Sequence, residues 1–229
     1  MRMLATCFLV LIAMNAHAAD KPASPTALVI HGGAGVIERK DLSADEERDI
    51  RAALDQALQA GQAVLSAGGT ALDAVQAAVV TLEENPRFNA GKGAVYNALG
   101  KHELDASIME GHTRRAGAVA SVTTIRNPIK LARAVMEHSE HVMLIGAGAE
   151  QFADAQPALE RVPNTWFDTE TRLKQLQDAQ AREQREAHSA DAGNLKGKYF
   201  GTVGAVALDV HGHIAAAPSA GGMSNKKWG

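Results

Sequence analysis

Strand-forming apolar runs stand near both ends of this chain, with helical segments between them. The run TALVIHGGAG at 26–35 is rich in aliphatic residues and is broken by glycines, as is typical of a short strand and its turn. Paired strands are expected at 102–110 and 116–125, a buried strand at 141–148, and two more strands around a turn at 211–213. This grouping predicts an α+β fold of layered sheets with helices outside.

Four segments have the character of helices. Apolar residues recur every three to four positions from Ile50 to Leu65, so one stripe of that segment can face a core. The segment SAGG at 66–69 ends this helix, and a second is expected over 70–86, where Pro86 stops it. Further helices are expected over 128–139 and 170–186, and a surface linker over 187–198.

The overall composition is that of an ordinary globular protein. The 229 residues are 46% hydrophobic and 21% charged, and the formal net charge is −3. This supplies enough apolar material for one sizeable core and at most two domains. No basic excess suggests a nucleic-acid partner, and no run after the first residues is long and apolar enough to span a membrane.

The first 18 residues differ from the rest. Arg2 gives a positive start, the run at 4–14 is apolar, and 16–18 reads Ala-His-Ala, which matches the cleavage site of a secretory signal peptide. The run is too short for a transmembrane anchor, so we expect a secreted or periplasmic protein. The only cysteine, Cys7, lies in this leader, and residues 19–229 therefore have neither a disulfide nor a thiol nucleophile.

The glycine-rich turn HGGAG at 31–35 has two interpretations. Converging backbone amides could stabilise an oxyanion, but a tight turn after a strand explains the glycines equally simply and is favoured. The His31-Gly32-Gly33 sequence is also similar to the oxyanion turn of α/β-hydrolases. Those enzymes need a G-x-S-x-G elbow, and the segment around Ser219 lacks its first glycine, so a serine esterase is the weakest alternative.

Histidines and carboxylates elsewhere give weaker signals. His211 and His213 share a strand face, but two imidazoles are too few for a typical metal site and His-Gly-His fits a hairpin turn. Asp73 falls in the first turn of its helix, where the helix dipole favours a negative charge. Glu83 and Glu84 are expected to be solvated near the end of the same helix.

Thr202 opens the strand that follows the linker. A threonine hydroxyl is a poor nucleophile unless a base removes its proton. If the chain were cut between Gly201 and Thr202, the new α-amino group, with a pKa of about 7.7–8.0, could be that base. Gly201 tolerates the strained backbone that such a cut requires. Local chemistry alone still favours an ordinary β-branched residue at the start of a strand.

Seven sequence blocks that occur in a fixed order favour the nucleophile interpretation of Thr202. HGGAG, FNAGKGAV, HELDASIMEG, AGAVASV, NPIKLARAVME, HVMLIGAGAE and GTVGAVALD together cover nearly all of 27–229. The chain resembles the plant-type asparaginases/isoaspartyl peptidases, which are N-terminal threonine nucleophile hydrolases. The resemblance implies an αββα sandwich, incomplete at its C-terminus, made as a precursor that cuts itself. It divides the chain into a leader at 1–18, an α portion at 19–201 and the start of a β portion at 202–229.

The resemblance also implies roles for particular residues. Thr202 matches the nucleophile, and Asn89 matches an asparagine that helps position it. Family substrates are L-asparagine and β-aspartyl dipeptides; no cofactor is needed for catalysis, and αβ heterodimers pair again. Main-chain carbonyls of one loop would bind a structural sodium ion, and the residues concerned are Leu82, Glu83, Asn85, Phe88, Ala90 and Lys92.

Two departures from the family pattern leave a second hypothesis open. Ala220 stands where the family has a threonine whose hydroxyl supports the nucleophile, and alanine cannot form that hydrogen bond. The family's substrate-binding residues would lie beyond Gly229. The alternative is therefore a catalytically impaired remnant, such as an exported interaction protein.

Overall fold

A six-stranded mixed sheet forms the centre of the protein. The computed structural model describes residues 25–33, 42–187 and 201–228. The strand order is β1-β5-β6-β2-β3-β4, in which only β3 and β4 are parallel neighbours. The strands are β1 (Ala27–His31), β2 (Leu104–Glu110), β3 (Ala116–Val122), β4 (Met143–Ile145), β5 (Val203–Leu208) and β6 (Ile214–Ala220). The predicted leader at 1–18 lies outside the described residues, as does the predicted linker over 187–198 apart from Ala187, which ends α5.

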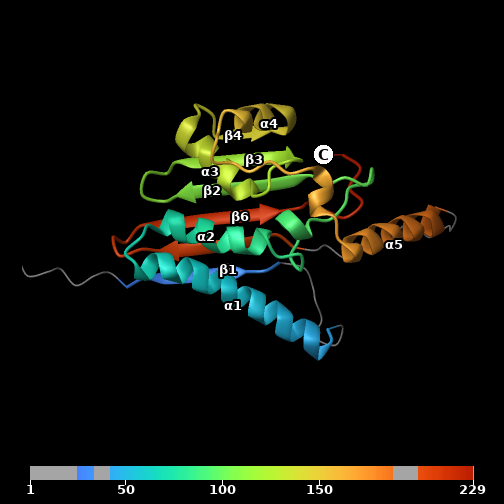
Figure 1. Ribbon diagram of the computed structural model, residues 1–229, viewed down its shortest axis with the longest axis horizontal. Coiled ribbons are helices and arrows are strands. Elements are labelled where there is room, and N and C mark those ends of the chain that lie inside the picture. The colour runs from blue at the N-terminus through green and yellow to red at the C-terminus, as the bar shows by residue number, and fades with distance from the viewer. Residues whose placement is uncertain (1–24, 34–41, 188–200, 229) are drawn as a thin grey trace, which may run out of the picture.

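Helices cover one face of this sheet (Figure 1). The helix α2 packs against β5 and β6, α3 packs against β2 and β3, and α1 lies over α2 and β1. The helices are α1 (Ala44–Ser66), α2 (Ala71–Glu83), α3 (Pro128–His138), α4 (Gly146–Asp154) and α5 (Glu170–Ala187), with short 3-10 turns η2 (Gly91–Gly93) and η3 (Asn164–Phe167). Among the described residues, no helix has the length and apolar character needed to cross a membrane.

The two faces of the sheet differ in exposure. Val203, Ala205 and Ala207 of β5 point toward α2 and are buried, whereas Val206 between them is 47% exposed. Strand register places further exposed apolar side chains on the face of Val206, namely Val29, Met109, Met143, Ile145 and Ile214. The α+β class is confirmed: the described residues form one helical layer and one sheet, and the opposite face of the sheet is apolar enough to receive another layer.

Capping residues explain where the first two helices begin. Ser43 and Glu46 form a capping box, which starts α1 well before the apolar stripe that the sequence shows. Thr70 accepts a hydrogen bond from the backbone of Asp73 at 3.1 Å, and Asp73 also pairs with Arg133. The expected position of Asp73 in a first helical turn is therefore confirmed.

The buried strand predicted at 141–148 is wrong. Only Met143–Ile145 is a strand, and Met143 and Ile145 are 52% and 64% exposed on this outermost strand. Gly146 adopts a φ of +48°, which a glycine tolerates easily, and α4 begins there. The apolar run thus divides into an edge strand and a helix. The paired strands at 102–110 and 116–125, the turn at 211–213 and the helix over 170–186 are confirmed.

Candidate active site

Thr202 lies directly before β5, partly buried, at the end of the sheet where β1 finishes. Val203 is opposite Ser219 on β6, so the same register carried one residue further places Thr202 opposite Ala220. On the other side of β6, Ala220 pairs with Asp105 of β2. Residues opposite one another share a sheet face. Thr202, Ala220 and Asp105 therefore form a row on the face turned away from α2.

The described part of the glycine-rich turn, His31-Gly32-Gly33, packs against this end of β5. A Cβ atom built on Gly33 would stand 3.4 Å from the carbonyl oxygen of Gly201, and Gly33 has a φ of +151°. A Cβ on Gly32 would come within 2.6 Å of the Phe88 ring. The glycines thus permit a close approach, which supports the structural interpretation of the turn. The turn also touches the peptide that is predicted to be cut.

Asn89 connects the loop after α2 to the chain that follows Ala220. Its side-chain oxygen accepts a hydrogen bond from Val95 N at 3.0 Å, and its amide donates to Gly222 O at 2.8 Å. Its own carbonyl accepts from Gly221 N at 3.0 Å. Asn89 is 3% exposed. It therefore fixes the backbone beside Ala220, on the strand next to Thr202.

Glu83 is completely buried, so the expectation that it is solvated is wrong. Its Oε1 accepts the Ser219 hydroxyl at 2.7 Å and the backbone amide of Ile129 at 3.0 Å. Its Oε2 has no hydrogen-bond partner among the described residues. Burial raises the pKa of Glu83 to about 8, against the opposing effect of its hydrogen bonds. Glu83 follows Val79 by four residues, and this shared helical stripe is the signal that sequence reasoning missed.

Glu84 lies beside Glu83 but faces a different environment. It accepts two hydrogen bonds from the Arg126 guanidinium, at 2.9 and 2.8 Å. Burial opposes ionisation of Glu84, but the hydrogen bonds from Arg126 and Asn127 hold its pKa below the ordinary value. The two adjacent carboxyl groups are thus a buried acid and a paired anion, and they do not form a catalytic pair.

Ser219 cannot be the exposed nucleophile of an esterase. It is 1% exposed, and its hydroxyl is engaged by Glu83 on the α2 side of the sheet. The strand register puts it on the face opposite Thr202 and Ala220. The serine esterase alternative is therefore excluded by geometry.

A sequence model described as asparaginase matches residues 24–229. The chain belongs to the asparaginase family. It is 49% identical over 199 residues to the isoaspartyl peptidase of Escherichia coli, and the match covers 87% of this chain and 62% of that protein. It is 44% identical over 206 residues to the isoaspartyl peptidase/L-asparaginase of Homo sapiens, covering 90% and 63% respectively. The chain thus spans less than two thirds of the length of these relatives.

The loop after α2 in this asparaginase-family chain is folded tightly on itself. A Cβ on Gly91, whose φ is +50°, would overlap the carbonyl of Glu83, and one on Gly93 would overlap the carbonyl of Phe88. The carbonyls of Leu82, Asn85 and Ala90 accept backbone hydrogen bonds within the same loop. The main-chain carbonyls are therefore closely packed in this loop, and those of Leu82, Asn85 and Ala90 each already accept one backbone hydrogen bond. A hard cation bound here would use the second lone pair of these oxygens. The Lys92 side chain points elsewhere, to the carbonyl of Trp166.

Residues far along the chain hold this loop, and sequence reasoning missed them. The buried Arg172 of α5 donates to Gly93 O at 2.7 Å and to Arg87 O at 3.3 Å, and burial lowers its pKa to about 10. The buried His102 ring lies between Val95 O at 3.2 Å and Asp168 Oδ1 at 3.1 Å. The contact of His102 with Asp168 spans 66 residues and those of Arg172 span more, so no local sequence pattern signals them.

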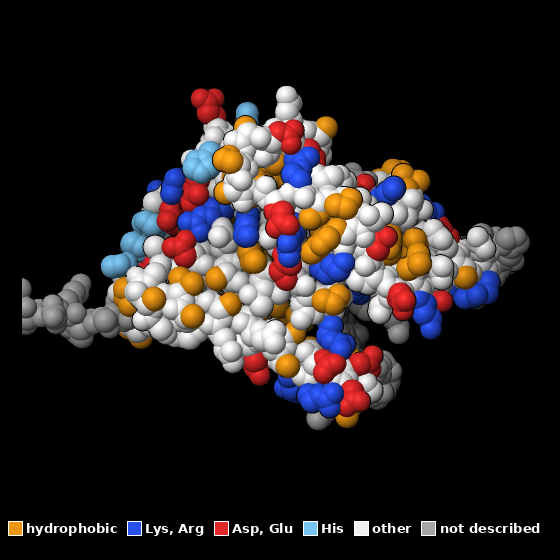
Figure 2. Space-filling model, viewed as in Figure 1, with side chains coloured by type: hydrophobic (Ala, Val, Ile, Leu, Met, Phe, Trp, Pro, Cys, Tyr) orange, Lys and Arg blue, Asp and Glu red, His pale blue; other side chains and the backbone are white. Residues whose placement is uncertain are grey.

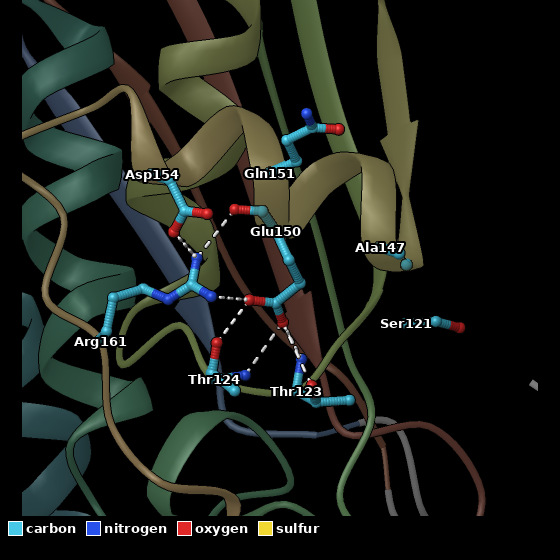
Figure 3. A pocket seen from close by; sticks show the side chains of 9 residues that line it. Ser121, Thr123, Thr124, Ala147, Glu150, Gln151, Asp154 and Arg161 are labelled. Atoms are coloured by element: carbon cyan, nitrogen blue, oxygen red, sulfur yellow. Dashed lines mark hydrogen bonds and ion pairs between the residues drawn. The ribbon is translucent and has the colours of Figure 1, made fainter.

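An open cavity of about 460 Å³ lies at the ends of β3 and β4 (Figure 3). Glu150 of α4 accepts hydrogen bonds from the Thr123 and Thr124 amides at 2.6 and 3.0 Å. Arg161 pairs with Glu150 at 2.8 Å and with Asp154 at 3.2 Å. These polar groups satisfy one another. Ser121, which also lines the cavity, donates its backbone amide to Asp105 at 2.9 Å, so the cavity lies at the same end of the sheet as the row of Thr202, Ala220 and Asp105.

Proposed function

We propose that this protein is an amidohydrolase that cleaves L-asparagine and β-aspartyl dipeptides through Thr202, after its own cleavage between Gly201 and Thr202. The observation that carries the proposal is the position of Thr202 directly before the first residue of β5. There the glycine turn touches Gly201, and Asn89 fixes the chain beside Ala220. The printed names of relatives 42–49% identical support the same chemistry.

The reaction follows from the two groups on one residue. The free α-amino group of Thr202 takes the hydroxyl proton while the oxygen attacks the side-chain carbonyl carbon of the substrate. The C–N bond then breaks, the proton leaves with ammonia or with an amino acid, and a β-aspartyl ester of Thr202 remains. Water attacks this ester, aspartate is released, and the threonine is restored. The amine works as a base near neutral pH because its ordinary pKa is about 7.7–8.0.

A structural sodium ion is part of the proposal. The carbonyl oxygens of the loop from Leu82 to Lys92 would hold it, and the ion would supply positive charge that keeps these oxygens together. No group of three or more His, Cys, Asp or Glu side chains in the described ranges could hold a metal ion. The contribution of the loop is to present Asn89 to the chain beside Ala220.

Secretion and assembly complete the proposal. The leader at 1–18 would direct export to the periplasm or the medium, and the cut chains would remain together as an αβ unit that pairs again. A non-catalytic interaction protein is the less favoured alternative, because the named relatives are peptidases and asparaginases.

Ammonia release tests the proposed activity. The full gene product is incubated with L-asparagine and, separately, with a β-aspartyl dipeptide whose released amino acid is quantified. We expect turnover that disappears in Thr202→Ala and survives in Thr113→Ala, where a threonine is removed from a distant turn. Equal turnover by wild type and Thr202→Ala would overturn the assignment of the nucleophile.

A further inference from the structure

The row of Thr202, Ala220 and Asp105 crosses three neighbouring strands and leads toward the open cavity at the ends of β3 and β4. Neighbouring strands lie ~4.8 Å apart, so Asp105 lies two strand spacings, or about 10 Å, from Thr202. Ala220 between them contributes only a methyl group. The carboxyl group of Asp105 is therefore the first charged side chain along this row.

The other side of Thr202, toward β1, is occupied by protein. A Cβ atom built on Gly204 would stand 2.5 Å from His31 Nε2, so the imidazole ring lies directly over the backbone of β5. The turn at Gly33 packs against the carbonyl of Gly201, the residue before Thr202. Within the described part of the chain, a substrate bound at Thr202 therefore has room on the side of Asp105 and not on the side of β1.

A β-bulge fixes the position of Asp105. The register of β2 and β3 shifts between Leu104 and Ala106, so Ala120 and Ser121 together lie opposite Asp105. Ser121 has a φ of +53°, a left-handed conformation that is unfavourable for a residue with a Cβ atom. Its backbone amide donates to Asp105 Oδ1 at 2.9 Å. One oxygen of the Asp105 carboxylate thus holds the bulge.

The second carboxylate oxygen of Asp105 is available to a ligand. Asp105 is partly exposed, and among the residues that the structure describes none forms a hydrogen bond or an ion pair with its Oδ2. Lys226, which follows β6, lies 2.9 Å from Glu103, so its charge is already compensated. A carboxylate with one unoccupied oxygen and no paired cation attracts a positively charged group.

The cavity beyond the bulge is polar and formally acidic. Ser121 lies on the side of the cavity opposite Arg161 (Figure 3). The charged side chains that line it are Glu150, Asp154 and Arg161, two anions and one cation, and Arg161 pairs with both anions. Figure 2 shows acidic and basic side chains close together on the surface around α4. A cationic group that reaches this end of the sheet therefore meets an excess of negative charge.

We propose that Asp105 is a specificity-determining residue that favours β-aspartyl dipeptides whose leaving amino acid has a cationic side chain, such as lysine. This inference rests on the proposed function. In such a dipeptide seven bonds of ~1.5 Å join the attacked carbonyl carbon to the ammonium nitrogen, a reach of about 9 Å when extended. The ammonium group can therefore contact Asp105 while Thr202 attacks the carbonyl carbon. The ammonia that leaves L-asparagine does not reach Asp105, so the preference concerns dipeptides alone.

Competition between two dipeptides tests the inference. The full gene product is incubated with equal concentrations of β-aspartyl-lysine and β-aspartyl-norleucine, whose side chains share four carbons and differ by the terminal ammonium group. The initial ratio of released lysine to released norleucine equals the ratio of the two kcat/KM values. We expect a ratio of about five in the wild type, between the effects typical of an exposed ion pair and of a hydrogen bond to a charged group.

Asp105→Asn should bring this ratio close to one, because the amide keeps an acceptor for the Ser121 amide but has no charge. The control variant Asp55→Asn removes an exposed carboxylate from α1, on the other face of the sheet, and should keep the wild-type ratio. Circular dichroism checks that both variants are folded. A purely structural role of Asp105 would change both rates together and leave the ratio unchanged.

Two results would overturn the inference while leaving the proposed function in place. One is equal release of lysine and norleucine by the wild type, and the other is a lysine preference that Asp105→Asn retains. Release of neither amino acid by the wild type would contradict the proposed function, and the specificity of Asp105 with it.

Discussion

The Ser219 hydroxyl donates a 2.7 Å hydrogen bond to the buried carboxyl group of Glu83, on the sheet face opposite Ala220 and Thr202. This contact joins the end of α2 to the last strand of the candidate site. Because the carboxyl group is completely buried, its neutral form is favoured. The protonation state of Glu83 is therefore linked to the stability of β6, the strand beside Thr202.

Stability should fall as pH rises from about 5 to 8. Glu83 in the unfolded chain ionises near its ordinary pKa of 4.5, whereas the folded protein keeps the proton until about pH 8. The unfolded state binds fewer protons in this window, so the free energy of unfolding decreases there, by at most about 1.4 kcal/mol per pH unit from this group. The contribution is complete below pH 4.5 and is lost above pH 8. Urea denaturation across this range measures it.

The Glu83→Gln variant isolates the contribution of this carboxyl group. A neutral amide cannot ionise, so the variant should lose this downward slope while keeping an acceptor for Ser219 and Ile129. Glu84→Gln is the matched control, since Glu84 is an ion-paired neighbour with a lowered pKa and its loss should leave the slope in place. An unchanged slope in Glu83→Gln would mean that Glu83 is already ionised in the folded protein.

Asn89→Ala should destabilise the protein and slow chain cleavage. The substitution leaves Val95 N and Gly222 O without their buried side-chain partner, which costs about 1–3 kcal/mol for each unsatisfied group. Equilibrium denaturation measures the loss. Gln62→Ala, which removes an exposed amide from α1, should change stability by less than about 0.5 kcal/mol. Equal effects of the two substitutions would contradict the assigned role of Asn89.

Substitution of a glycine in the loop after α2 should cost far more stability than substitution of an exposed glycine. Gly93→Ala places a Cβ against the backbone carbonyls of Phe88 and Pro86, so we expect a loss of about 3 kcal/mol or more. Gly100 has a φ of +70° and open space around it, so Gly100→Ala should cost only the backbone strain of about 1 kcal/mol. Thermal denaturation compares the two, and similar melting temperatures would show that the loop is looser than described.

A hydroxyl introduced opposite Thr202 should accelerate the proposed chain cleavage. Ala220→Thr places a hydroxyl next to Thr202 on the same sheet face, where it can donate or accept a hydrogen bond. We expect cleavage faster by about tenfold, the equivalent of one good hydrogen bond in the transition state. Ala216→Thr adds the same side chain farther along that face of β6 and should have no effect. Equal cleavage rates in the two variants would show that a hydroxyl at position 220 does not assist cleavage.

Local signals predicted much of the fold. The pairing of β2 with β3 follows from two apolar runs separated by a short polar turn, and α3 follows from Asn127 and Pro128 at its start. The early start of α1 could have been found from the capping box at Ser43. The run at 141–148 was misassigned because a continuous apolar stretch does not reveal which part is helix.

Contacts between distant segments could not be predicted in this way. The stacked His112 and His213 rings come from two different turns, and the buried Arg172 lies far in sequence from the Gly93 carbonyl that it contacts. The environment of Glu83 could be predicted in part. Its place on the apolar stripe of α2 follows from the sequence, but its hydrogen-bond partners come from β6 and α3 and could not be predicted. The assignment of Thr202 rests on ordered family blocks, because a threonine at the start of a strand is locally unremarkable.

Intact-mass spectrometry tests the central claim most directly. The purified gene product should separate, under denaturing conditions, into one fragment that ends at Gly201 and one that begins with Thr202. Thr202→Ala should remain a single chain, and Thr202→Ser should be cut slowly, because serine retains the hydroxyl. A wild-type protein that hydrolyses L-asparagine or β-aspartyl dipeptides while its chain stays permanently intact would contradict the account.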